Sequence, residues 1–210
     1  MGSYAQLAQQ TEVDREAVLR MSLNPRRCAF LCGLPRTRVD FRKALIVGEY
    51  CRSISGGWGD YERWVVHGIE KLASLEETYG LIVIPYISAD RFAGFLDGGL
   101  DLVVLFTHSR PDGFLEFSEG MVHRDRLIKA LPRESTFIWD LLACRNDGFS
   151  EAVHERAPNM VVVSADRTLT PNSWLEYYAV MFAMIARFAA SYSQAKLAAD
   201  NYAHRMAHDR

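Results

Sequence analysis

Two side chains that can act together in catalysis stand at the ends of neighbouring apolar runs. The run LDLVVLFTH ends in His108, and the run TFIWDLLAC ends in Cys144. In an open parallel sheet, the carboxyl ends of the strands form the edge at which ligands bind. We therefore expect the imidazole and the thiol to share one crevice, where a histidine can act as the base for a cysteine nucleophile.

The pattern of apolar segments predicts the elements that would hold these two residues. Strands are expected at 43–50, 81–87, 100–108, 136–144 and 159–166. The apolar residues recur at helical spacing in 61–80 and 149–158, and shorter turns of helix are expected at 89–99 and near 127–131. A hairpin is expected from 112 to 120, and a long final helix from 173 to 205. Strands that alternate with helices predict an α/β fold: three αβα layers around a mostly parallel sheet.

Length, charge and cysteine content narrow the class of protein. The 210 residues predict one domain, at 43–205, after an N-terminal extension at 1–42. A net charge of -2 provides no excess of basic residues that would favour binding to nucleic acid or to an anionic membrane surface. The four cysteines are irregularly spaced and follow no export signal, which predicts free thiols in the cytoplasm.

The residues around His108 and Cys144 resemble those of the caspase-like cysteine peptidases. The sequence DLLACRND is similar to the caspase pattern ending in Ala-Cys-Arg-Gly, and VVLFTHS is similar to the family's apolar strand ending in His-Gly. The order of elements also looks like this fold, and the short chain is closest to the bacterial CHAT-type proteases. The resemblance implies Cys144 as nucleophile, His108 as general base or acid, and the backbone N–H groups of Ser109 and Cys144 as oxyanion donors.

Substrate contacts are also implied by the resemblance. They fall on Leu142, two residues before the cysteine, and on Asp166 and Arg167 after the last strand. An acidic pocket would favour a basic residue before the scissile bond, which is the preference we expect, with Asp140 and Glu116 as further acidic candidates. The resemblance implies a protein or peptide substrate, an activating or regulatory protein as a second partner, and no cofactor or metal.

Two other functions remain open at this point. Ser109 replaces the usual glycine and Leu142 replaces a usual polar residue, which favours a catalytically weak caspase-like module that binds other proteins. The glycine-rich segment SISGGWGD, at 53–60, suggests a nucleotide- or flavin-binding loop, although it lacks the Walker lysine and the GxGxxG spacing. The pairs Cys28/Cys32 and His204/His208 lack further ligands for a metal ion.

Overall fold

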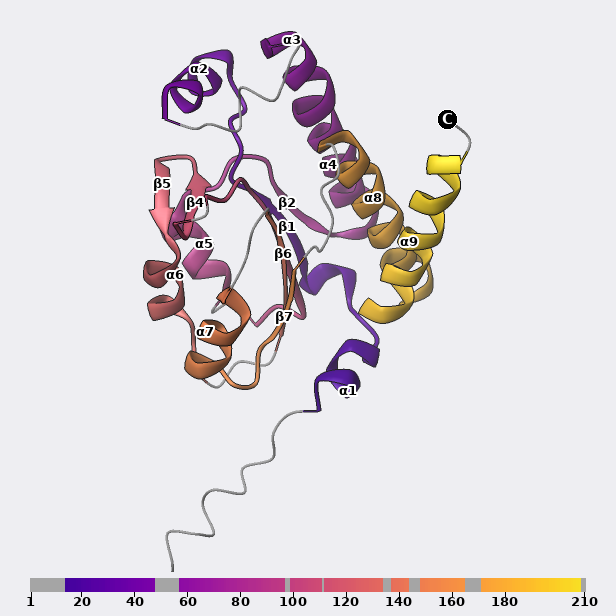
Figure 1. Cartoon of the computed structure of the whole chain (residues 1–210). Coiled ribbons are helices and arrows are strands. Elements are labelled where there is room, and N and C mark those ends of the chain that lie inside the picture. Colours follow the sequence, from indigo (N-terminus) through magenta and orange to yellow (C-terminus); the bar gives the residue numbers. More distant parts are fainter. Residues whose placement is uncertain are drawn as a thin grey trace, which may run out of the picture.

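A five-stranded parallel sheet lies between two layers of helices in the computed structural model of the chain (Figure 1). The structure describes residues 14–47, 57–96, 99–110, 112–133, 137–143, 148–164 and 171–208. The predicted three-layer α/β fold is therefore confirmed.

The sheet has the strand order β2-β1-β3-β6-β7, and each neighbouring pair is parallel. Its strands are β1 (Cys28–Cys32), β2 (Ile82–Ile84), β3 (Leu102–Phe106), β6 (Ile138–Leu142) and β7 (Val161–Ser164). Every residue of β1, β3 and β6 is buried. Burial on both faces explains why these strands read as continuous apolar runs rather than as alternating ones.

Each face of the sheet packs against its own set of helices. One face is covered by α1 (Arg15–Arg20), the continuous helical segment α3 (Gly57–Tyr61), η4 (Glu62–Val66) and α4 (His67–Tyr79), and the last two helices, α8 (Pro171–Phe188) and α9 (Tyr192–His208). The other face is covered by α5 (Ala89–Leu96), α6 (Arg124–Ala130) and α7 (Phe149–Arg156). Within β1 the side chains alternate, so that Phe30 enters the first core and Leu31 the second.

The strand predicted at 43–50 is wrong, because residues 38–47 form helix α2 (Arg38–Val47) and 48–50 lie outside the described residues. The Thr37 side chain accepts a hydrogen bond from the Asp40 backbone N–H at 3.2 Å and donates one to the Asp40 carboxylate at 2.6 Å. This reciprocal cap is a signal for a helix start that outweighs the apolar run following it.

The first strand of the sheet instead lies inside the segment predicted as an extension. β1, preceded by the short turn η2 (Pro25–Arg27), pairs with both β2 and β3. Helix α1 also packs on the domain, because the Arg15 side chain donates a hydrogen bond to the Val162 carbonyl oxygen of edge strand β7 at 3.2 Å. Residues 14–42 are thus part of the folded domain.

The long final helix predicted at 173–205 is two helices with a break at Ala189, whose φ is 49°. The Ser22 hydroxyl donates to the Ala189 carbonyl oxygen, and the Leu23 N–H donates to that of Ala190, so the chain before β1 holds the break. Phe188, the last residue of α8, is 70% exposed. The hairpin is confirmed as β4 (Phe114–Phe117) and β5 (Gly120–His123).

Across the described ranges, no helix has the length and apolar character needed to cross a membrane.

Candidate active site

His108 follows β3 by two residues and is half-buried at the carboxyl edge of the sheet. Burial, together with the nearby positive charge of Arg110, lowers the pKa of His108 from 6.5 to about 4. Desolvation disfavours the charged imidazolium, so the ring is neutral at neutral pH. A neutral imidazole at this edge is able to accept a proton, as a general base must.

The hairpin fixes the backbone on either side of His108. The Glu116 N–H donates to the His108 carbonyl oxygen at 2.9 Å, and the Thr107 hydroxyl donates to the Glu116 carbonyl oxygen at 2.5 Å. A Cβ atom at Gly33 would overlap that same carbonyl oxygen. The end of β1 and hairpin strand β4 therefore approach as closely as glycine permits, and they hold the loop that carries the histidine.

Strand β6 delivers the chain to the same edge. Phe106 of β3 pairs with Leu142 of β6, and the Thr107 N–H continues the pairing by donating to the Leu142 carbonyl oxygen at 3.1 Å. Leu142 is buried in the core beneath this edge, and Ala143 is buried after it. Cys144, Asp166 and Arg167 lie outside the described residues.

Ser109, the predicted oxyanion donor, is buried beside the hairpin, where it forms a bridge with Leu115. Among the described residues its hydroxyl oxygen has no hydrogen-bond partner. Within the described parts of the chain its backbone N–H donates no hydrogen bond either.

The two described cysteines cannot supply a thiolate. Burial raises the pKa of Cys28 and of Cys32 to about 12. Both side chains are fully buried in β1 and are free thiols. A buried thiol of this kind behaves as a small apolar group and is unreactive.

Asp140 does not reach the edge where a substrate would lie. The carboxyl is buried on the side of the sheet facing α8 and α9, where it accepts a hydrogen bond from the Tyr192 hydroxyl at 2.7 Å and also bonds Tyr178. Burial raises the pKa of Asp140 from 3.8 to about 6, although both tyrosines and the Lys196 ammonium act in the opposite direction. Asp140 is thus a core residue that joins β6 to the final helices.

This buried carboxyl predicts a pH dependence of stability. Because its pKa is raised in the fold, the folded chain binds more protons than the unfolded chain between pH 4 and 6, so ionisation of Asp140 lowers stability as pH rises. The shift from 3.8 to about 6 corresponds to ~3 kcal/mol of unfolding free energy. Asp140→Asn, which cannot ionise, should gain about this much relative to the native chain between pH 4 and 7, as measured by urea unfolding.

The exposed carboxyl of Asp112 provides the control for that experiment. Asp112→Asn should follow the native chain at every pH. A constant difference in stability between Asp140→Asn and the native chain across this range would contradict the assigned role of burial.

The crevice where nucleotides bind in many open α/β sheets is filled in this protein. Strand order reverses between β1 and β3, which is the switch point at which such crevices open. Here Gly33 and Thr107, which follow those two strands, pack against the backbone of β4. Of the glycine-rich segment at 53–60, residues 57–60 belong to helix α3, and 53–56 lie outside the described ranges.

Sequence reasoning missed two features of this edge. One is the role of the hairpin in holding His108, which depends on contacts between residues distant in the sequence. The other is a pocket beside the ends of β1 and β2. The local signals for it were Pro85, directly after β2, and Pro35, shortly after the end of β1.

Comparison with models of protein families, with curated proteins and with solved structures finds no match to this chain.

Proposed function

We propose that the protein is a cysteine peptidase with a caspase-like fold, in which His108 and Cys144 form the catalytic dyad. The pairing of β3 with β6 carries this proposal. His108 and Cys144 each stand two residues after the paired residues Phe106 and Leu142. Adjacent strands lie about 4.8 Å apart, and covalent geometry keeps the Cα atom of Cys144 about 3.8 Å from that of the buried Ala143. These limits are compatible with the thiol and the imidazole meeting as the proposal requires.

The neutral imidazole suits the first step of such a reaction. His108 accepts the thiol proton as the Cys144 sulfur attacks the carbonyl carbon of the scissile peptide bond. The Ser109 N–H donates a hydrogen bond to the oxygen on which negative charge develops. The imidazolium then gives its proton to the leaving amine, and a water molecule, deprotonated by His108, hydrolyses the thioester and regenerates the thiol.

The substrate in this proposal is a protein or peptide with a basic residue before the scissile bond. Asp166 is the acidic residue assigned to that pocket, with Arg167 and Leu142 beside it. Burial of Leu142 gives the pocket no polar group from this position. The buried free thiols of β1 favour a reducing compartment such as the cytoplasm, with activation by a partner protein.

A second candidate function is a caspase-like module without strong catalysis that binds other proteins. The side chain of Ser109 favours it, because a buried hydroxyl that has no hydrogen-bond partner in the described ranges occupies the position next to the base. If this hydroxyl displaces the backbone N–H from the oxyanion, turnover would fall while the fold and its surfaces remain.

Hydrolysis of fluorogenic peptides distinguishes these two functions. Peptides with Arg, Lys, Asp or Glu before the cleaved bond are incubated with the native chain and with Cys144→Ala. A peptidase releases the fluorophore after Arg or Lys, and the alanine variant does not. Equal release by both chains would reject the dyad, whereas a native chain that releases none, even with purified candidate activators, would favour the binding module.

A further inference from the structure

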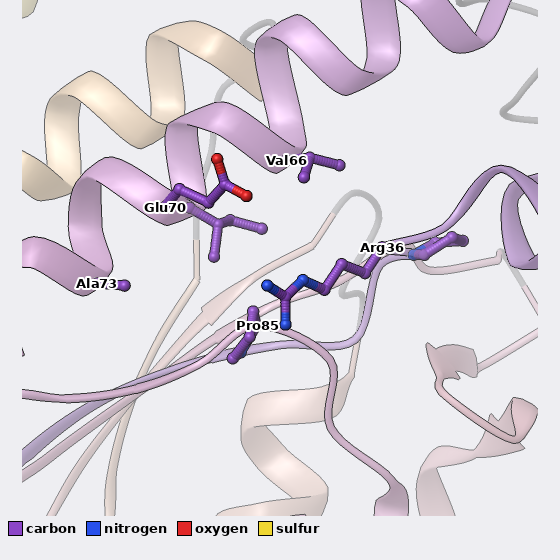
Figure 2. Close-up of a pocket in the computed structure, with 7 residues that line it drawn as sticks. Arg36, Val66, Glu70, Ala73 and Pro85 are labelled. Atoms are coloured by element: carbon purple, nitrogen blue, oxygen red, sulfur yellow. The ribbon is translucent and has the colours of Figure 1, made fainter.

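Positive charge is concentrated on and just before helix α2, in a chain whose net charge is -2. Residues 36–43 include Arg36, Arg38, Arg42 and Lys43, all of them exposed, and a single acidic residue. Arg36 precedes the helix and lines the pocket beside α4 (Figure 2). The other three basic residues belong to α2, which follows β1 and lies beyond the carboxyl end of the sheet (Figure 1).

The side of α2 that faces the domain is marked by Phe41. This side chain is buried, and its ring contacts the rings of Tyr61 and Trp58, with centroids 4.6 Å and 5.6 Å away. Asp40 also lies near the domain, because its charge adds to the effect of burial in raising the pKa of Tyr86 to about 12. The acidic residue of the helix is thus turned partly inward.

The opposite side of α2 is basic around one apolar residue. Val39 and Lys43 stand two positions before and after Phe41, and helix residues two positions apart do not share a face. Val39 is 62% exposed. Arg38 and Arg42, one turn apart, form a second exposed row beside them. We call these four residues, Arg38, Val39, Arg42 and Lys43, the basic face of α2.

The charges of this face are little used by the rest of the protein. Within the described parts of the chain, the Arg38 and Arg42 guanidinium groups form no ion pair or hydrogen bond. The Lys43 ammonium has only the Asp40 carboxylate, at 3.8 Å. Guanidinium groups pair with carboxylates through two parallel hydrogen bonds, so the face has the chemistry to bind acidic side chains.

We propose that the basic face of α2 binds an acidic segment of a partner protein, in which glutamate or aspartate residues flank one apolar side chain. The carboxylates pair with Arg38 and Arg42, and the apolar side chain covers Val39. A short segment meets only the local positive charge, since charges are screened beyond ~8 Å at physiological salt. An extended polyanion would also meet the remainder of the chain, where acidic residues are in excess. The inference does not depend on the peptidase reaction.

Removing the two arginines tests the charge contacts. The probe is a fluorescent peptide with two glutamates on each side of a leucine, and its binding to the full chain is measured by fluorescence anisotropy at low salt. Arg38→Gln/Arg42→Gln should bind it about three- to tenfold more weakly than the native chain does. The matched control is Lys71→Gln/Arg91→Gln, which removes the same charge from exposed positions of α4 and α5 and should bind as the native chain does.

A second peptide, with serine in place of the leucine, tests the contact with Val39. The native chain should bind it about threefold more weakly than the leucine peptide, and Val39→Ser should bind the two peptides equally. Absence of binding, or equal weakening by both double variants, would overturn the proposal. Tighter binding of duplex RNA or of phosphatidylserine vesicles than of the leucine peptide, lost in Arg38→Gln/Arg42→Gln, would overturn it in favour of a nucleic acid or a membrane.

Discussion

Replacing His108 by alanine is expected to lower peptide hydrolysis by about 10²- to 10⁴-fold, the usual contribution of a general base. The reason is that His108 stands at the carboxyl end of β3, next to the strand that leads to Cys144. Initial rates on a fluorogenic arginine peptide measure the effect. His154→Ala, at an exposed position of α7, is the matched control and should keep native activity. Retention of more than a tenth of the native rate by His108→Ala would contradict its role as base.

The pKa of His108 predicts how activity falls at acidic pH. A general base must be deprotonated to work, and the pKa of His108 is lowered to about 4 by burial and by Arg110. Activity should therefore persist through pH 5 and fall near pH 4, whereas an ordinary histidine would lose it near 6.5. The exposed Arg110 side chain contributes to this shift, so Arg110→Gln should move the acid limb toward higher pH.

Replacing Gly33 by alanine is expected to destabilise the fold by about 3 kcal/mol, as is typical of overpacking against rigid neighbours. The added methyl group would overlap the Glu116 carbonyl oxygen and come within 2.9 Å of the Thr107 hydroxyl. The carbonyl belongs to a backbone strand that cannot rotate away as a side chain can. Because Glu116 also bonds the His108 backbone, the displaced hairpin should lower hydrolysis in molecules that remain folded.

Gly94→Ala is the matched control for this substitution. Gly94 lies in helix α5, and a Cβ atom there would meet nothing within 4 Å. Alanine is the better helix former, so this change should stabilise the chain by roughly 0.5 to 1 kcal/mol. Urea unfolding measures both variants. A neutral Gly33→Ala would show that β1 and the hairpin are not packed as closely as described.

Sequence patterns were sufficient to predict those elements that are both apolar and bounded by turn residues. β3 and β6 read as buried strands because they are covered on both faces, and the glycine turns located the hairpin. The parallel pattern then placed His108 at the carboxyl edge. That step needed no knowledge of distant contacts, since strand direction alone fixes the edge.

Other elements depend on contacts that no local pattern carries. β1 is only five residues long and lies between β2 and β3 in the sheet, so its place depends on two neighbours far along the chain. The break at Ala189 is held by Ser22 and Leu23, more than 160 positions earlier. The lowered pKa of His108 likewise follows from burial, which the sequence does not display.

The rate at which each cysteine reacts with iodoacetamide tests the dyad most directly. Modified peptides are counted by mass spectrometry at neutral pH for the native chain, for His108→Ala and for the chain unfolded in urea. The dyad predicts that Cys144 reacts faster in the native chain than in the unfolded chain, that His108→Ala removes this advantage, and that Cys28 and Cys32 remain unmodified in the fold. A Cys144 that reacts no faster in the native chain than in urea, with or without His108, would contradict the dyad.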